Sequence, residues 1–174
     1  MGSHSLNHFN QKEEEKLILE LFRQEYELFP SGKLSKTESP DFMLRNSQKV
    51  ATGIELTKLH GPGQEKLRTH FSRGDSTYIT PEPSYENIGY TIRAKEDKLY
   101  LYRKKKPSQI WLIITTDLTD SPVSYNLANK LANWKFQSEF NKVFLFELAG
   151  RKVFELVGCI LLFVWVLGVC LDGY

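Results

Sequence analysis

Cysteine is scarce in this chain of 174 residues, which contains only Cys159 and Cys170. Both lie in an apolar stretch near the C-terminus, form no Cys-X-X-Cys pair and have no histidine nearby. A structural zinc site needs closely spaced Cys or His ligands, and a disulfide-stapled fold needs a framework of several cysteines. The sequence therefore argues against both and fits a reducing compartment.

An excess of charge of either sign is also missing. The chain has 23 Lys and Arg against 21 Asp and Glu, a formal net charge of +2. Total charge therefore does not indicate a nucleic-acid-binding protein, and any electrostatic argument rests on where charges cluster. A secretory signal is lacking near the N-terminus, because Glu13, Glu14, Glu15 and Lys16 stand where an apolar run would be needed. We therefore expect a cytoplasmic protein.

What the chain does have is the composition of one globular domain. Hydrophobic residues make up 41% and charged residues 25%, and the length is that of a single domain able to bury its own core. Hydrophobic spacing predicts these elements: a helix over 10–29, a polar stretch over 31–39, a hairpin of strands 41–44 and 50–57, a long loop over 59–82, a helix from Pro83 to before Pro107, a strand over 110–114, a helix over 124–134, and a hairpin of strands 142–148 and 151–156. This order predicts an α/β fold with a mixed central sheet flanked by helices.

Two acidic residues of the first hairpin are the main candidates for chemistry. Asp41 follows Pro40 at the start of one strand, and Glu55 lies in the neighbouring strand, fourteen residues later. Strand side chains alternate between faces, so Glu55 and Thr57 share one face. Two carboxylates on adjacent strands can converge on a hard cation such as Mg²⁺, which polarises a phosphodiester and activates a bound water.

Pro40-Asp41 and the segment from Gly53 to Thr57 resemble the PD-(D/E)XK nuclease-like superfamily, which includes many restriction and repair endonucleases. The resemblance extends to a helix before the motif and to a helix plus an apolar strand after it, and covers roughly residues 10–116. It implies a restriction endonuclease-like core over residues 10–156. It also implies a DNA-cleaving endonuclease, in which Asp41 and Glu55 hold Mg²⁺ or Mn²⁺.

The resemblance departs from the family pattern at Thr57, where the family has a lysine that assists the attacking water. Lys58 is adjacent, but we expect it to point to the opposite face. Lys95 interrupts the apolar stripe of the second helix, and members of the superfamily relocate the lysine to such a helix. The resemblance therefore implies catalytic roles for Asp41, Glu55, Thr57 and Lys95. It further makes Glu25, on the first helix, a candidate outer metal ligand.

Basic residues near the motif are candidates for contacts to DNA, the expected partner ahead of RNA. In and next to the long loop these are Lys58, Lys66, Arg68 and Arg73. The run from Arg103 to Lys106 ends a predicted helix, and either phosphate contact or the helix dipole explains it. A homodimer is left open.

Each candidate also has a structural interpretation. Asp41 can shape a turn after Pro40, Glu55 can face water, and Lys95 can lay its stem along the core. Glu25 can be an ordinary carboxylate on a helix surface. Because the motif lysine is absent, the alternative to an enzyme is a catalytically impaired module that binds nucleic acid or a protein.

The last residues, 157–174, form an apolar tail that we separate from the domain. The sixteen residues from Leu156 to Leu171 carry no charge and would extend about 24 Å as a helix, whereas a bilayer span takes roughly 20 residues. A membrane anchor, a buried terminal element and an altered reading frame are the three interpretations. An anchor would leave the domain cytoplasmic, because Arg151 and Lys152 precede it.

Overall fold

The protein is built around one six-stranded sheet with strand order β1-β2-β3-β4-β5-β6. The computed structural model describes residues 11–62, 82–116 and 127–157. The strands are β1 (Lys33–Lys36), β2 (Phe42–Arg45), β3 (Ala51–Lys58), β4 (Gln109–Thr115), β5 (Lys142–Glu147) and β6 (Lys152–Val157). The helices are α1 (Gln11–Glu25), α3 (Tyr85–Glu96), α4 (Leu99–Arg103) and α5 (Leu127–Leu131).

The sheet is mixed, as the order of the predicted elements indicated. Strands β1, β2 and β3 are antiparallel neighbours, β3, β4 and β5 run parallel, and β6 returns antiparallel to β5. Parallel neighbours need a crossover, and α3 and α4 supply the one between β3 and β4. Both predicted hairpins, β2–β3 and β5–β6, are confirmed.

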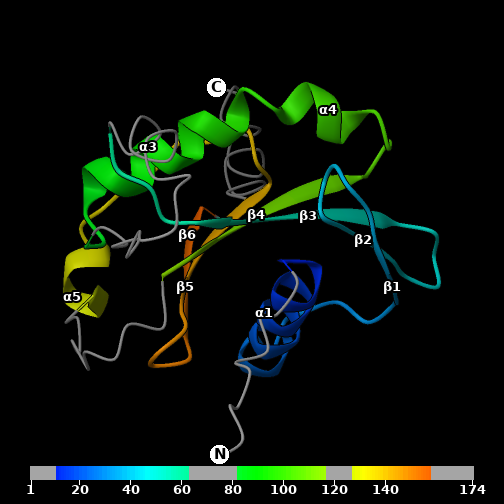
Figure 1. Ribbon diagram of the computed structural model, residues 1–174, viewed down its shortest axis with the longest axis horizontal. Helices are drawn as coiled ribbons and strands as arrows, with labels where there is room; N and C mark the ends of the chain where they lie inside the picture. Colours follow the sequence, from blue (N-terminus) through cyan, green and yellow to red (C-terminus); the bar gives the residue numbers. More distant parts are fainter. Residues whose placement is uncertain (1–10, 63–81, 117–126, 158–174) are drawn as a thin grey trace, which may run out of the picture.

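Helices cover the two faces of this sheet (Figure 1). On one face, α1 packs through Ile18, Leu19 and Phe22 onto an apolar cluster of the sheet, and on the other, α3 and α4 pack onto a second cluster. Strand β4 contributes to both: Trp111 and Ile113 face α1, whereas its intervening residues face α3 and α4. The predicted strand over 110–114 is therefore confirmed, and it is covered on both faces.

The predicted helix boundaries were wrong at three places. Helix α5 ends at Leu131 rather than at 134. Helix α1 ends at Glu25 rather than at 29, and its chain continues as a turn in which the Phe29 N–H donates to the Tyr26 carbonyl. The second predicted helix is two helices, because the chain breaks at Asp97 and Lys98 between α3 and α4.

Strand β1 was not predicted. Its sequence, Lys-Leu-Ser-Lys, is polar and largely exposed, so it lacks the apolar alternation that indicates a strand. It forms because it lies at the edge of the sheet beside β2, where Leu34 pairs with Leu44 and the Ser35 hydroxyl donates to the Met43 carbonyl. Lysine and polar side chains are common on edge strands.

Part of the sequence-based interpretation falls outside the described residues. Lys66, Arg68 and Arg73 lie there, as does the tail beyond Val157, the last residue of β6. Within residues 11–62, 82–116 and 127–157, no helix has the length and apolar character needed to cross a bilayer.

Candidate functional site

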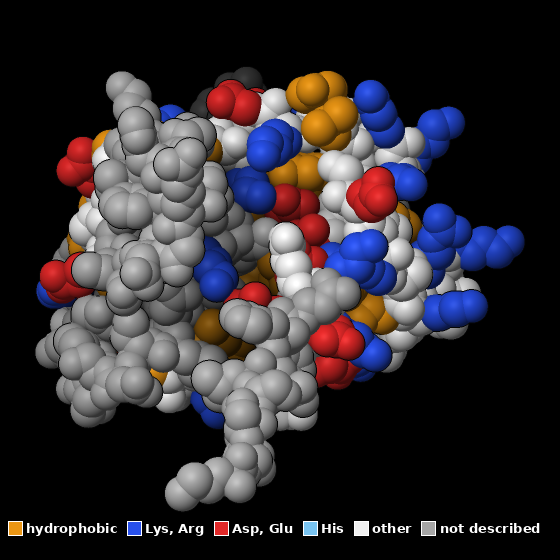
Figure 2. Space-filling model, viewed as in Figure 1, with side chains coloured by type: hydrophobic (Ala, Val, Ile, Leu, Met, Phe, Trp, Pro, Cys, Tyr) orange, Lys and Arg blue, Asp and Glu red, His pale blue; other side chains and the backbone are white. Residues whose placement is uncertain are grey.

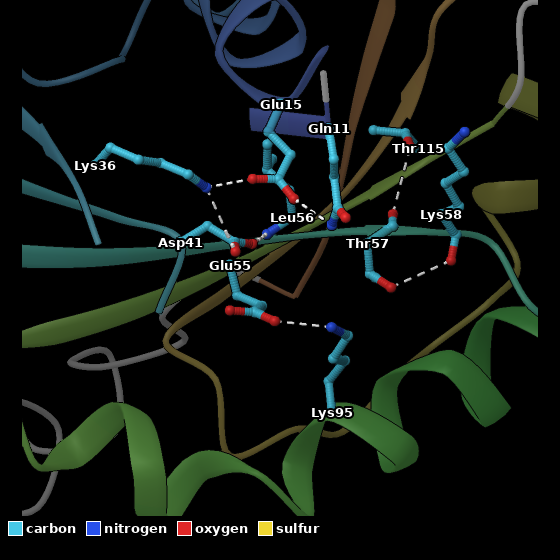
Figure 3. Close-up of polar contacts among 10 residues, drawn as sticks. All are labelled: Gln11, Glu15, Lys36, Asp41, Glu55, Leu56, Thr57, Lys58, Lys95 and Thr115. Atoms are coloured by element: carbon cyan, nitrogen blue, oxygen red, sulfur yellow. Dashed lines mark hydrogen bonds and ion pairs between the residues drawn. The ribbon is translucent and has the colours of Figure 1, made fainter. Parts of the chain in front are cut away.

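The β2–β3 hairpin places Asp41 and Glu55 next to each other. Phe42 pairs with Ile54, so the antiparallel register continued by one residue sets Asp41 opposite Glu55, where Cβ atoms are about 5 Å apart. The backbone N–H of Leu56 donates to Asp41 Oδ2 at 2.8 Å and fixes that carboxylate against β3. Figure 2 shows acidic side chains in the middle of the face in view, bordered by Lys and Arg, and Figure 3 shows Asp41 beside Glu55.

Glu55 is a buried carboxylate that points away from α1. Its neighbours Ile54 and Leu56 fill the cluster under α1, so alternation along β3 directs Glu55 toward α3. The residue is 6% exposed, which rules out the interpretation in which it simply faces water. Burial of a carboxylate is costly unless it is paired. Lys95 of α3 provides that partner, with Nζ 2.7 Å from Glu55 Oε1.

Helix α3 is held in the position that lets Lys95 reach the sheet. Ser84 caps its N-terminus by accepting a hydrogen bond from the Asn87 N–H. The fully buried Thr91 then links α3 to the end of β3, because its hydroxyl accepts from the His60 N–H at 3.0 Å and lies 3.1 Å from the His60 carbonyl. Lys95 is one turn further along and on the same helix face as Thr91. Lys95, which interrupts the apolar stripe, therefore points toward the sheet and pairs with the Glu55 carboxylate.

The pKa of Asp41 is raised by its burial next to Glu55. Burial and then the charge of Glu55 raise its pKa to about 6, against the lowering effects of the Leu56 N–H and of Lys36. Lys36 Nζ lies 3.6 Å from Asp41 Oδ1 and also pairs with Glu15 of α1. A carboxylate such as Asp41, whose ionisation is disfavoured by burial and by a neighbouring negative charge, is typical of functional sites.

Tyr102 of α4 is a member of this site that sequence reasoning missed. It lies in the second predicted helix and is 1% exposed. Its hydroxyl is buried and makes no hydrogen bond of normal geometry. Burial and the neighbouring Glu55 carboxylate raise the pKa of Tyr102 well above its ordinary value, so the hydroxyl keeps its proton. No sequence signal separates such a tyrosine from an ordinary core residue.

The acidic residue that α1 brings toward Asp41 is Glu15, not the predicted Glu25. Glu15 is joined to Asp41 through Lys36 and accepts a hydrogen bond from Gln11 at 3.0 Å. Glu25 lies ten residues further on, about 15 Å along the helix axis, and pairs with Arg151 in the β5–β6 turn at 3.1 Å. The resemblance placed the acidic residue on the correct helix but about three turns too far along it.

Thr57 and Lys58, the other two predicted site residues on β3, face opposite sides of the sheet. Thr57 is nearly buried on the same face as Glu55, and its hydroxyl donates to the Lys58 carbonyl at 3.3 Å. Lys58 points to the opposite face, as expected, where its ammonium lies 3.1 Å from Glu14 of α1. Of the residues assigned catalytic roles, Asp41, Glu55 and Lys95 are therefore brought together, and Thr57 is beside them without a direct hydrogen bond to them.

The chemistry of the donors fits a hard divalent cation. Asp41 and Glu55 offer only carboxylate oxygens, which suit Mg²⁺ or Mn²⁺ and not the softer metals that prefer Cys or His. Among residues 11–62, 82–116 and 127–157, no three His, Cys, Asp or Glu side chains form a metal-holding cluster. Mg²⁺ commonly takes one or two carboxylates and keeps several waters, so two carboxylates suffice. Comparison with protein-family models, curated proteins and solved structures gives no match to this chain.

Proposed function

We propose that this protein is a divalent-metal-dependent nuclease-type hydrolase that cleaves phosphodiester bonds of DNA. The observation that carries the proposal is the pair of adjacent carboxylates, Asp41 and Glu55, with Lys95 on Glu55 at 2.7 Å. An acidic pair can hold a metal ion that polarises a phosphodiester and activates a water, and a neighbouring lysine adds a positive charge for phosphate or water. The helix α1 before the motif, and the helices and apolar strand β4 after it, support a restriction endonuclease-like core.

Each side chain has a distinct role in this proposal. Asp41 and Glu55 would hold Mg²⁺ or Mn²⁺, and the Leu56 N–H fixes the orientation of the Asp41 carboxylate. The ion, when bound, supplies Lewis-acid polarisation of the phosphodiester and lowers the pKa of a coordinated water. Lys95 takes the place of the missing motif lysine, because its ammonium is already held at the carboxylates from α3.

Two further residues complete the proposed site. Thr57 stands two residues after Glu55 on the same face of β3, where its hydroxyl can donate to water or phosphate. Lys95 would be available to donate a hydrogen bond to water or to a phosphate oxygen when Glu55 holds an ion. Lysine suits this role because its ammonium is a compact charge on a flexible stem.

A plasmid cleavage assay tests the proposal. The wild type is compared with Asp41→Asn and Glu55→Gln in Mg²⁺ or Mn²⁺. Glu20→Gln is the control, since the Glu20 carboxylate of α1 is partly exposed and pairs with Arg23 of the same helix. Loss of a metal ligand removes several kcal/mol of transition-state stabilisation, so both site variants should lose roughly 100-fold or more in rate. Equal rates in all four proteins would refute the catalytic role.

The second candidate function is a binding module without catalysis. The observation that favours it is that Thr57 replaces the motif lysine and that Lys95, its substitute, already neutralises Glu55. Calorimetric titration with Mg²⁺ separates the two candidates. Stoichiometric binding that disappears in Asp41→Asn supports the enzyme, whereas no heat of binding in the wild type supports the module.

A further inference from the structure

One end of the sheet carries a cluster of positive charge that the site itself does not use. We call it the basic end, and its members are Lys33, Arg45, Lys49, Lys104, Lys105 and Lys106, all exposed. They come from β1, β2, the β2–β3 turn and the connection between α4 and β4. Figure 2 shows Lys and Arg side chains along the right-hand edge of the face in view, where Figure 1 places α4 and β2.

The sheet register brings these separate segments together. Lys33 pairs with Arg45 across β1 and β2, and Arg45 pairs with Ala51 across β2 and β3. The Ser108 N–H donates to the Ala51 carbonyl at 2.7 Å, which draws the connection after α4 to the same end. The basic end is therefore a feature of the folded protein, and only Lys104 to Lys106 are adjacent in the sequence.

The charge of the basic end is not neutralised by the residues that the structure describes. No ion pair joins any of its six members to a carboxylate in the described ranges, whereas Arg103 just before it pairs with Glu139 at 2.9 Å. The helix dipole accounts for cations after α4 but not for Lys33 or Arg45, which belong to strands. Six like charges on one end repel one another, and a bound polyanion relieves that repulsion.

The distance from the basic end to the carboxylates fits a DNA backbone. Asp41 and Arg45 are four positions apart, as are Ala51 and Glu55, which is about 13 Å at 3.3 Å per residue. Successive phosphates of one strand advance about 3.4 Å along the duplex axis, so 13 Å corresponds to about four base pairs. A duplex with one phosphate at Asp41 and Glu55 would thus pass over the basic end.

We propose that the basic end binds the sugar–phosphate backbone of duplex DNA about four base pairs to one side of the phosphodiester held at Asp41 and Glu55. The inference rests on the proposed function for the position of that phosphodiester. The contacts are to phosphates and carry no base specificity, so they fix the register of the duplex over the site.

Binding to a fluorescent 20-base-pair duplex, followed by anisotropy in EDTA between 50 and 200 mM salt, tests the inference. The full chain is compared with Arg45→Gln/Lys104→Gln/Lys105→Gln, which avoids Lys49 and Lys106 because both have positive φ. The control, Arg93→Gln/Lys135→Gln/Lys152→Gln, removes the same charge from exposed positions elsewhere. Circular dichroism verifies that all three proteins are folded.

Each phosphate contact contributes about 0.9 to the slope of log K against log salt concentration. The basic-end variant should therefore lose about 2.7 in slope, together with at least a tenfold loss of affinity at 100 mM salt, while the control keeps the wild-type slope. Equal slopes in the two variants, or no binding of duplex by the wild type, overturn the inference. Binding of phosphatidylserine vesicles that falls in the basic-end variant, with an unchanged DNA slope, also overturns it and identifies a membrane surface.

The assay separates this inference from the proposed function, because EDTA removes catalysis from the measurement. If the wild type cleaves plasmid DNA but the basic-end variant keeps its slope, the inference fails and the enzyme stands. If the slope falls as expected and plasmid DNA is never cleaved, the basic end is upheld as a DNA-binding surface and the enzyme fails.

Discussion

Both the stability of the protein and the proposed chemistry depend on the ion pair between Lys95 and Glu55. Lys95→Met keeps the length of the side chain but leaves Glu55 buried without its partner. Breaking a buried ion pair from one side costs about 3–5 kcal/mol, and the partial exposure of the lysine reduces this to about 2–4 kcal/mol. We therefore expect a lower free energy of unfolding in urea denaturation, and DNA cleavage slower by about 100-fold.

A change in metal affinity separates the two roles of Lys95. In Lys95→Met, Mg²⁺ can bind Glu55 without first breaking the ion pair with Lys95. Mg²⁺ should therefore bind this variant more tightly than the wild type in calorimetry. Lys98→Met, at an exposed position on the same segment, is the control. Full cleavage activity in Lys95→Met would mean that the lysine only neutralises Glu55.

Asp41 makes the stability of the protein depend on pH. Its pKa is raised from 3.8 to about 6 in the folded chain, so the folded state holds its proton more tightly than the unfolded state does. The resulting stabilisation is fully present below pH 3.8 and is lost as the pH rises through 6. Asp41→Asn removes this titration, and it should gain about 2–2.5 kcal/mol relative to the wild type between pH 4 and pH 7.

Urea denaturation at both pH values, without divalent metal, measures the gain. Asp97→Asn, an exposed change between α3 and α4, should show no pH-dependent difference from the wild type. A constant difference between Asp41→Asn and the wild type across the range would contradict the shared burial of Asp41 and Glu55.

At the scale of elements, the β2–β3 hairpin depends on Gly53. A Cβ added to Gly53 would lie 2.8 Å from Pro40 Cγ, so Pro40 would have to move and would carry Asp41 with it. Gly53→Ala should cost about 1–3 kcal/mol of stability and slow DNA cleavage at least tenfold. Unfolding and cleavage assays on the same preparation measure both.

Gly89→Ala is the matched control in helix α3. There the nearest atom to an added Cβ is the flexible Arg93 side chain at 3.3 Å. Alanine in a helix interior is favoured over glycine by about 1 kcal/mol, so this variant should be slightly more stable and should keep its activity. If Gly53→Ala retained wild-type cleavage, the spacing of Pro40 from β3 would not set the position of Asp41.

The elements that sequence patterns predicted are those with strong local signals. The β-branched run of β4 and the paired apolar segments of β5 and β6 are apparent from residue type alone. Strand β1 lacks such a signal, because only pairing with β2 makes Lys33–Lys36 extended. The break at Asp97 and Lys98 was missed because the apolar stripe continues across it, from Ile92 to Leu99.

At the scale of the whole molecule, the candidate site was predictable only in part, for a physical reason. Asp41 and Glu55 belong to one hairpin, so local sequence is enough to place them together. Glu15 and Tyr102 approach them from helices that are distant in the sequence and on opposite faces of the sheet. Their positions follow from tertiary packing, for which the sequence offers helical periodicity but no register against the sheet.

Mg²⁺ should stabilise the domain as a whole if Asp41 and Glu55 bind it. A ligand that binds only the folded state adds about 2.7 kcal/mol at 100 times its Kd, which for a domain of this size is about 5–10 °C in Tm. Burial and the charge of Glu55 raise the pKa of Asp41. A bound cation would relieve the repulsion between the two carboxylates, and this relief adds to the free energy of Mg²⁺ binding. Differential scanning calorimetry at pH 7.5, with NaCl of equal ionic strength as the control, measures the shift.

The double variant Asp41→Asn/Glu55→Gln determines where the ion acts. In this variant Lys95 and Lys36 remain while both negative charges are gone, so the site is left with a net positive charge and should repel a cation. Its Tm should therefore not rise with Mg²⁺. An equal rise of Tm in both proteins would mean that the ion binds elsewhere. A ligand stabilises a protein only by binding its folded state, so a variant without the binding residues loses that stabilisation.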